Sequence, residues 1–330
     1  MGNKVAFCVV TWNNADVIAT CLDSLLAQQG VDYDIYLIDN ASTDNTRAAL
    51  SQYPNMHVTY SDSNRGFAGG NNILIKQALA DPDVRYVALI NSDAVLAPDW
   101  TATLVAFAEN HGHVGSLQGL TLDFFDNSII DSQHIYVNQY LVGVQYGYSE
   151  LVMPDQYYPR KVFGVNAAAA IYTRAMIEAL PDRQHGFLDE RFHMYYEDVD
   201  AAFRALVCGW DAWFVPKAVA YHMGSVSAKR RGSSFSARMT ARNWAAMVFK
   251  NAPWPIILKT AWPASRAMVS FARSMAEIHG QKVGLQTALA LVQGVLRLPI
   301  YASSRRRILA KQVIDSKYLL HILNNNGILG

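Results

Sequence analysis

The sequence lacks the features that mark several common classes of protein. Only three of its 330 residues are cysteine, and the spacing of Cys8, Cys21 and Cys208 suits neither a metal site nor a disulfide framework. We expect all three to be small buried hydrophobic side chains in a reducing compartment. No uncharged apolar run approaches the roughly 20 residues that cross a bilayer, and no separate signal peptide precedes the first apolar run. These absences favour a cytoplasmic protein.

Two nucleotide-binding fingerprints are missing as well. No Gly-x-Gly-x-x-Gly follows the first predicted strand, which argues against a nicotinamide-dependent dehydrogenase. No Gly-x-x-x-x-Gly-Lys-Ser/Thr is present to support a nucleoside triphosphatase. A nucleotide site in this chain must therefore be built in another way.

Acidic residues are scarce in the last third of the chain. Positions 229–330 hold 16 Lys and Arg but only Glu277 and Asp315, a net charge of +14, whereas positions 1–228 hold 12 basic and 25 acidic residues. The near-neutral total thus hides an acidic body and a basic tail. Such a tail suggests an anionic partner. A membrane surface is favoured over nucleic acid, because no nucleic-acid-binding module accompanies the charge.

The first 120 residues alternate β-rich runs with helical patterns. Repeated βα units predict an α/β fold with a mostly parallel sheet flanked by helices. Ligands of such sheets bind beyond the carboxyl ends of the strands, and polar segments follow the predicted strands here, at 11–14, 39–40, 61–70 and 91–93. The expected strands are 5–11, 34–38, 56–60 and 85–90, and the expected helices are 17–26, 43–52 and 70–80.

A crowd of carboxylates and aromatic residues, 186–200, leads into a clear amphipathic helix. Apolar residues at Val199, Phe203 and Val207 share one face of that helix, so Glu197 and Asp198 fall in its first turn. The helix N-terminus favours a carboxylate over a carboxylic acid, so at least one of the pair is expected to be ionised at neutral pH and to serve as a general base. The alternative is that these residues only complement the helix dipole, with Asp200 pairing to Arg204.

Two further segments suggest a diphosphate and a metal ion. The segment 64–72 contains an arginine and three glycines before a predicted helix, which suits a phosphate-bearing ligand, although it is also compatible with an ordinary connector. Asn91-Ser92-Asp93 follows a predicted strand. An acidic residue there is often only a turn former, but near a phosphate-binding loop it provides the hard oxygen ligand that Mg²⁺ or Mn²⁺ requires.

These motifs together resemble the family 2 glycosyltransferases, which have the GT-A fold, and among them the bacterial rhamnosyltransferases of surface-polysaccharide assembly. The likeness spans roughly residues 4–250, so we expect a GT-A domain at 1–250 and a helical, basic region at 251–330. The ordered elements that carry the resemblance are 9–13 with 21–25, 38–44, 64–72, 89–93 and 187–204.

The resemblance implies a role for several residues of a nucleotide site. Asp39 would accept a hydrogen bond from the imino N–H of uracil or thymine, which implies a pyrimidine donor. Arg65 would lie near the diphosphate, where its guanidinium offsets the charge of the leaving group. The remaining positions that the resemblance places in the nucleotide site are Thr11, Gly66, Asn91 and Ser92.

The resemblance also implies a metal site and a catalytic base. Asp93 matches the last aspartate of the family's Asp-x-Asp metal motif, while Asn91 stands where the first aspartate is usual. His222, in the segment 221–225 after a predicted strand at 212–215, matches a histidine that supplies a further metal ligand, although a lone histidine is more often structural. Asp198 matches the base that deprotonates the acceptor hydroxyl, and Glu197 would position the acceptor or the base. The implied reaction inverts the anomeric configuration.

Substrates and location follow from the same resemblance together with the charge. The implied donor is dTDP-rhamnose or a UDP-sugar, and the acceptor is a hydroxyl of a polyprenyl-diphosphate-linked glycan. Helix-like stretches at 267–278 and 283–298 are apolar and basic, which predicts a peripheral anchor on the inner face of a bacterial plasma membrane. The alternative for this tail is a helical oligomerisation subdomain. The alternatives for the whole chain are a non-catalytic nucleotide-sugar-binding scaffold and a nucleotidyltransferase.

Overall fold

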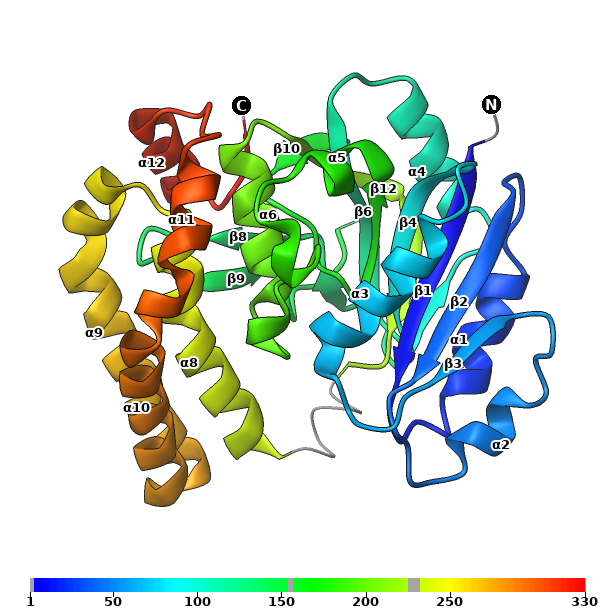
Figure 1. Cartoon of the computed structure of the whole chain (residues 1–330), viewed down its shortest axis with the longest axis horizontal. Helices are drawn as coiled ribbons and strands as arrows, with labels where there is room; N and C mark the ends of the chain where they lie inside the picture. Colours follow the sequence, from blue (N-terminus) through cyan, green and yellow to red (C-terminus); the bar gives the residue numbers. More distant parts are fainter. Residues whose placement is uncertain (1–2, 154–156, 225–231, 330) are drawn as a thin grey trace.

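A single large sheet runs through the centre of the protein. The computed structural model describes residues 3–153, 157–224 and 232–329. Figure 1 shows helices on both faces of the sheet and a group of C-terminal helices beyond one end. The strands are β1 (Lys4–Thr11), β2 (Tyr33–Asp39), β3 (His57–Tyr60), β4 (Val84–Asn91), β5 (Ala94–Leu96), β6 (Val114–Asp123), β7 (Ile130–Ser132), β8 (His134–Val137), β9 (Gly143–Tyr146), β10 (Arg160–Val162), β11 (Ala169–Thr173) and β12 (Asp211–His222).

The three longest helices belong to the tail of the chain. The body contains α1 (Ile18–Leu26), α2 (Thr46–Leu50), α3 (Gly66–Ala78), α4 (Trp100–Glu109), α5 (Arg174–Ala179), α6 (Glu197–Val207) and the short helical turns η1 (Arg183–His185) and η2 (Glu190–Phe192). The tail contains α8 (Ser233–Asn251), α9 (Trp254–His279), α10 (Gln281–Leu296), η3 (Leu298–Tyr301), α11 (Ala302–Leu309) and α12 (Ser316–Asn324).

The sheet order places the four expected strands side by side at one end of the sheet. The path is β10-β12-β6-β11-β4-β1-β2-β3, with β5 and β7 attached to β12 and β6. Strands β4, β1, β2 and β3 pair in parallel, as do β6 and β12, whereas β11 runs antiparallel between β4 and β6. These features confirm the predicted α/β class, with parallel strands whose carboxyl ends meet at one edge.

Strand β1 shows why the sheet is covered on both faces. Its residues are apolar at nearly every position, which is typical of a strand buried on both sides. Phe7 belongs to the core that includes α1 and α4, while its neighbours Ala6 and Cys8 belong to the core that includes α3, α5 and α6. Cys8 and Cys21 are fully buried, as expected from their apolar surroundings.

A third core joins the tail to the body. It combines Val199 and Phe203 of α6 with Met247 of α8 and Ile322 of α12, and the hairpin β8–β9 also contributes to it. Helices α8 to α11 lie together on the side away from α1 and α2 (Figure 1). The division of the chain at residue 250 stays a prediction, and this core contains residues from both sides of it.

Two elements differ from their predicted limits. Helix α3 begins at Gly66 rather than at residue 70, since the Asn64 side chain accepts a hydrogen bond from the Gly66 N–H at 2.8 Å and the glycine-rich segment becomes the first turns of the helix. Gly70 serves packing there, because a Cβ would lie 2.9 Å from Val10 of β1. Strand β12 continues past residue 215 to His222 through a register shift between Phe214 and Val219, which accommodates Pro216.

The length and hydropathy of the helices bear on whether one of them could span a membrane. Within the ranges that the structure describes, no single helix is long and apolar enough to span a bilayer. Helix α10 and the segment Leu298–Leu309 pass that test only as a pair bent by 50°.

Gly119 of β6 provides a test of the sheet packing that positions β12. A Cβ at this residue would lie 1.8 Å from the carbonyl oxygen of Ala218, so Gly119→Ala must push β12 away. We expect the free energy of unfolding, measured by urea denaturation, to fall by about 1–3 kcal/mol. The control is Gly112→Ala, where a Cβ meets no atom within 4 Å. Equal stabilities of the two variants would show that the close approach of these strands is not a constraint.

Candidate active site

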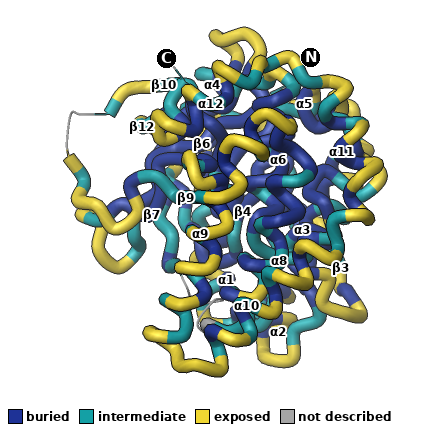
Figure 2. Tube along the Cα trace, turned by 90° about the vertical axis from the view of Figure 1, so that its left-hand side faces the viewer, coloured by how far each residue is buried: buried dark blue, intermediate teal, exposed yellow. Residues whose placement is uncertain are grey.

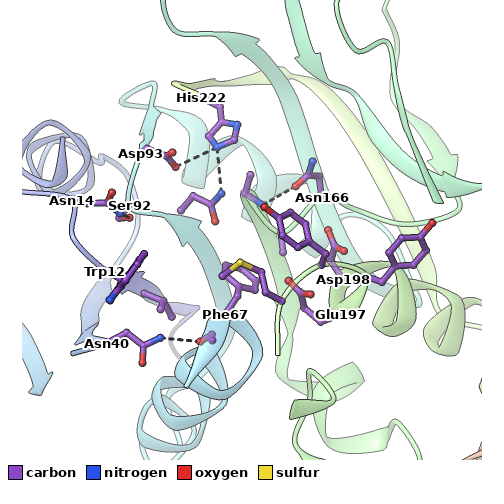
Figure 3. Close-up of a pocket in the computed structure, with 18 of the residues that line it drawn as sticks. Trp12, Asn14, Asn40, Phe67, Ser92, Asp93, Asn166, Glu197, Asp198 and His222 are labelled. Atoms are coloured by element: carbon purple, nitrogen blue, oxygen red, sulfur yellow. Dashed lines mark hydrogen bonds and ion pairs between the residues drawn. The ribbon is translucent and has the colours of Figure 1, made fainter. Parts of the chain in front are cut away.

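A cavity of about 330 Å³ lies at the carboxyl edge of the parallel strands (Figure 3). It collects side chains from β1, β4, the start of α3, the end of β12 and the first turn of α6, segments that lie far apart in the sequence. Seven predicted site residues line it: Gly66, Asn91, Ser92, Asp93, Glu197, Asp198 and His222. The other lining residues are Val10, Trp12, Asn14, Asn40, Phe67, Gln145, Asn166, Ala167, Ala168, Met194, Tyr195 and Tyr196.

At one end of the cavity His222 lies between two carboxylates. Its Nε2 is 3.3 Å from an oxygen of Asp93, and its Nδ1 is 3.2 Å from an oxygen of Asp131. The amide nitrogen of Asn91 also lies 3.3 Å from Nε2. The extension of β12 causes this meeting, because it pairs His222 with Ala94, directly after Asp93. The extended strand therefore brings His222 next to Asp93, the other residue that was predicted to bind the metal ion.

The charge of His222 depends on these two aspartates. Burial lowers the pKa of the imidazole, but hydrogen bonds with Asp131 and Asp93 outweigh that effect and raise the pKa to about 10. The pair of carboxylates thus favours a positive charge at this point, either as a proton on the imidazole or as a cation that replaces it. Within the described ranges, no three His, Cys, Asp or Glu side chains form a ready-made metal site.

Hydrogen-bonded asparagines hold the wall of the cavity that follows strands β1 and β2 (Figure 3). Asn14 is 2 % exposed and its amide donates to the Ser92 hydroxyl at 2.7 Å. Asn40, also 2 % exposed, accepts from the Arg65 N–H and donates to the Gly66 carbonyl, at 2.8 and 3.0 Å. These bonds fix the first turn of α3 against β2, so the wall is rigid before any ligand binds.

A run of left-handed backbone precedes the acidic pair. His193, Tyr195 and Tyr196 have φ values of 65°, 67° and 72°, which costs about 1–3 kcal/mol for each residue of this kind. The strain is balanced by helix α8, since the amide nitrogen of Asn243 donates to the carbonyls of Phe192, Met194 and Tyr195 at 2.8–2.9 Å. Strain of this kind, held by the surrounding fold, is typical of functional sites.

Glu197 and Asp198 begin α6, as the periodicity predicted, and both line the cavity. Burial raises the pKa of both carboxyl groups, and the charge of Asp198 raises the pKa of Glu197 further, to well above its usual range. Hydrogen bonds from the Val199 and Ala167 N–H groups partly offset the effect of burial on the pKa of Asp198. For Glu197 desolvation is thus a larger effect than the helix N-terminus, and the expectation that at least one member of the pair is ionised stays a prediction. Asp198 is the member of the pair that ionises first.

Three predicted site residues do not line the cavity. Thr11 is fully buried behind it. Asp39 is fully buried too, and its two oxygens accept hydrogen bonds from the Ser42 N–H at 3.0 Å and from Arg47 at 2.6 Å. Arg65 is exposed at the N-terminus of α3. Their roles toward a nucleotide stay predictions. Ser225, the last residue of the segment that carries His222, lies outside the described residues.

No local pattern pointed to three polar residues of the site. Gln145 and Asn166 line the cavity from β9 and from the loop before β11, and Asp131 contacts His222 from β7. These residues lie in short strands and loops without helical or alternating periodicity. By contrast, Asn14 and Asn40 follow strands β1 and β2, so the rule that ligands bind beyond strand ends pointed to them.

Comparison with known proteins places this geometry in a family. The family model described as Glycosyl transferase family 2 matches residues 6–180, more than half of the chain. The chain belongs to this family. The match covers β1 to β11 and therefore includes Asp93, while the segments that carry Asp198 and His222 follow it.

Relatives of this family 2 protein differ in how much of each chain the similarity covers. The succinoglycan biosynthesis protein ExoO of Rhizobium meliloti is 31% identical over 134 residues, 38% of this chain and 37% of that protein. The N-acetylglucosaminyl-diphospho-decaprenol L-rhamnosyltransferase of Mycobacterium tuberculosis is 26% identical over 271 residues, 74% of this chain and 84% of that protein. The first curated relatives are matched over only a quarter to a half of their own length.

A solved structure shows the same fold. The crystal structure of GalNAc-T7 with UDP, GalNAc and Mn²⁺ superposes with a TM-score of 0.62 at 14% sequence identity, covering 92% of this chain and 58% of that one. This likeness confirms the GT-A fold that the motifs implied.

Glu197 makes the stability of this family 2 protein depend on pH. Its raised pKa means that the folded state binds a proton more tightly than the unfolded state, so stability falls as pH rises above the usual glutamate pKa. We expect Glu197→Gln to remove this loss, so that the urea midpoint falls less between pH 5 and pH 8 than in the wild type. Glu150→Gln, at an exposed glutamate, is the matched control. A Glu197→Gln profile parallel to the wild type would contradict the assigned protonation.

Proposed function

We propose that the protein is an inverting glycosyltransferase that uses a nucleotide-diphosphate sugar. One observation carries this proposal: a single cavity has the Asp93–His222 pair at one end and the Glu197–Asp198 pair at the other (Figure 3). A site that transfers a sugar requires positive charge near the departing diphosphate and a base near the incoming hydroxyl. The two pairs provide these functions within one pocket.

Asp198 is the proposed base. Its carboxylate accepts the proton of the acceptor hydroxyl as that oxygen bonds to the anomeric carbon, while the bond from this carbon to the phosphate oxygen breaks and the nucleoside diphosphate leaves. A raised pKa makes Asp198 a stronger base than an ordinary aspartate. Burial and the charge of Asp198 raise the pKa of Glu197, which favours its protonated form, and in that form its carboxyl group donates a hydrogen bond that positions the acceptor.

The residues around His222 fit a divalent cation bound together with a diphosphate. Asp93 supplies a carboxylate oxygen and His222 an imidazole nitrogen at one point, and Asp131 orients the imidazole from its other side. Two protein ligands are few, but Mg²⁺ is commonly held by one or two carboxylates together with substrate phosphates. When bound, Mg²⁺ or Mn²⁺ supplies positive charge to the leaving diphosphate. The GalNAc-T7 structure, which contains Mn²⁺ and UDP, supports this assignment by analogy of fold.

The proposed donor is dTDP-rhamnose, or otherwise a UDP-sugar. The family resemblance of Asp39 and the rhamnosyltransferase relative from M. tuberculosis support this choice. That relative's name includes a diphospho-decaprenol, which supports a lipid-linked glycan as the acceptor, in the synthesis of a bacterial cell-surface polysaccharide. The second candidate function is a non-catalytic nucleotide-sugar-binding scaffold, which the neutral Asn91 at the first metal position favours.

Calorimetry and a rate measurement separate these functions. We expect dTDP or UDP to bind in the presence of Mg²⁺ or Mn²⁺, and GDP and ADP to bind more weakly. Asp93→Ala should abolish the metal-dependent binding. Asp198→Asn, the matched variant at the other end of the cavity, should keep it but lower the transfer or hydrolysis rate of the matching nucleotide sugar by about 10²–10⁴-fold.

Each other outcome selects a different function. Nucleotide binding with equal, slow turnover in wild type and Asp198→Asn would support the scaffold. Release of inorganic pyrophosphate in place of a nucleoside diphosphate would support a nucleotidyltransferase. Failure of all four nucleotides to bind would overturn the proposed function.

We also propose that the protein binds peripherally to the inner, anionic face of a bacterial plasma membrane through α9 and α10. Trp254, Leu258 and Trp262 of α9 are 55 %, 76 % and 74 % exposed at a spacing of four residues, and the exposed residues of α10 include Leu285, Leu289, Val292 and Leu296. Figure 2 marks exposed residues along both helices. Lys259, Arg266, Arg273 and Lys282 are exposed on the same two helices, and each basic residue near an anionic leaflet contributes about 1 kcal/mol.

Cosedimentation with vesicles tests this surface. We expect the protein to bind vesicles of phosphatidylglycerol and phosphatidylethanolamine, and to be released by salt. The double variant Leu258→Ser/Trp262→Ser should bind several-fold more weakly, whereas Phe125→Ser/Tyr158→Ser, which removes equally exposed apolar residues of the body, should bind normally. No vesicle binding, together with a dimer that the first double variant dissociates, would assign the surface to a second copy of the chain.

A further inference from the structure

Two arginine side chains meet where the end of α10 packs against the middle of α8. Arg242 is in α8, and Arg297 directly follows α10. Gly294 permits this approach, because a Cβ at this residue would lie 2.5 Å from the Arg242 carbonyl oxygen, and the two helices lie side by side in Figure 1. Burial lowers the pKa of the Arg242 guanidinium, and the nearby charge of Arg297 lowers it further. Two like charges are thus held close together.

No carboxylate pairs with either arginine within the part of the chain that the structure describes. The Nε of Arg242 donates to the Asn243 side-chain oxygen, and its Nη2 donates to the Phe192 carbonyl, both at 3.0 Å. Arg297 is half-buried, yet its guanidinium forms no hydrogen bond or ion pair with any described residue. By contrast, Lys250 of the same helix α8 contacts two aspartates. A half-buried cation without a counterion is unfavourable, so the arginine pair is suited to bind an anion.

The geometry of two guanidinium groups favours phosphate as this anion. Each planar group offers a fork of N–H donors, and a phosphate has enough oxygens to accept from both forks. The alternative is that Arg297 only complements the dipole at the C-terminus of α10. That alternative does not account for Arg242, which lies in the interior of α8 and is repelled by Arg297.

Apolar side chains flank the arginine pair. Leu296 directly precedes Arg297, Ile300 of η3 follows it, and both apolar residues are exposed. Val292 and Val295 continue this exposed apolar surface along α10, one of the two helices in the proposed membrane surface. A phosphate bound to the arginines therefore has apolar protein surface beside it. Such a site matches a phosphate that carries hydrocarbon, as in a phospholipid, better than a free phosphate ion.

We propose that Arg242 and Arg297 form a binding site for the phosphate group of a membrane phospholipid, whose acyl chains lie along Leu296 and Ile300. This site deepens the proposed membrane binding and rests on that proposal, but it does not depend on the transfer reaction. It adds a specific contact to an attraction that otherwise follows charge alone. Because Arg242 also donates to the Phe192 carbonyl, the bound lipid adjoins the strained segment before α6.

A soluble phospholipid tests the site without a membrane. The probe is dioctanoylphosphatidylglycerol below its micelle concentration, titrated into the protein with a metal chelator present, and inorganic phosphate is titrated in parallel. We expect one lipid per protein and weaker binding of phosphate. Arg297→Gln should weaken lipid binding by about ten- to a hundredfold, since hydrogen bonds to a charged group are lost. Arg273→Gln, which removes the same charge from an exposed position of α9, should bind the lipid as the wild type does.

Further variants separate the site from a folding defect and from the anchoring surface. Arg297→Gln should melt at the same temperature as Arg273→Gln, and Arg242→Gln should also weaken lipid binding. Leu258→Ser/Trp262→Ser should bind the soluble lipid normally while losing affinity for vesicles, so a failure of the membrane proposal is seen with vesicles alone. If Arg297→Gln and Arg273→Gln bind the lipid equally, or the wild type does not bind it, the site is wrong. If inorganic phosphate binds as tightly as the lipid, the ligand is a free phosphate ion and the phospholipid assignment is wrong.

Discussion

The buried ammonium group of Lys250 is the interaction on which the arrangement of the active site depends. It lies 2.6 Å from Asp189 and 2.8 Å from Asp200, and these three side chains are at most 2 % exposed. Asp189 precedes η2, Asp200 is in the first turn of α6, and Lys250 is near the end of α8, so one cation joins three segments. Removing one partner of a buried ion pair commonly costs about 3–5 kcal/mol, since the remaining charge has no water to solvate it. The pair expected from the sequence, Asp200 with Arg204, is present only at 3.9 Å.

This anchoring explains how strained backbone can persist next to the acidic pair. The left-handed residues between η2 and α6 are bracketed by Asp189 on one side and Asp200 on the other, and both carboxylates are fixed to the same lysine of α8. Asn243, two helical turns before Lys250, binds the carbonyls of the strained segment itself. Helix α8 therefore acts as a rigid support for the first turn of α6. The proposed base, placed in this way, would lose little conformational entropy when substrates bind.

Local sequence patterns predicted the parallel strands β1 to β4 and the position of Glu197 and Asp198 in the candidate site. The βα alternation located β1 to β4, because strands buried on both faces are continuously apolar, and the helical period located Glu197 and Asp198 in the first turn of α6. Long-range contacts could not be predicted in this way. Asp131 reaches His222 only through the pairing of β7 with β6 and of β6 with β12, and no local periodicity encodes these pairings. The glycine-rich segment was misjudged for a related reason: Gly69 and Gly70 belong to the helix, where Gly70 allows close packing on β1.

Charge counts were informative about the tail only in part. Lys250 pairs with Asp189 and Asp200, and Arg307 pairs with Asp182, so these two cations hold the tail to the body. Arg305 donates to the carbonyls of Phe249 and Ala252 and joins segments of the tail to each other. Other cations of the tail are exposed, and four of them lie on α9 and α10, the helices that also expose apolar side chains. Helix α9 has a different environment on each side, since Met268 is buried and the next residue, Val269, is exposed with the proposed membrane surface. The basic tail therefore has two parts: the cations that pair with Asp182, Asp189 and Asp200 support the body, and the exposed cations of α9 and α10 belong to the proposed anchor.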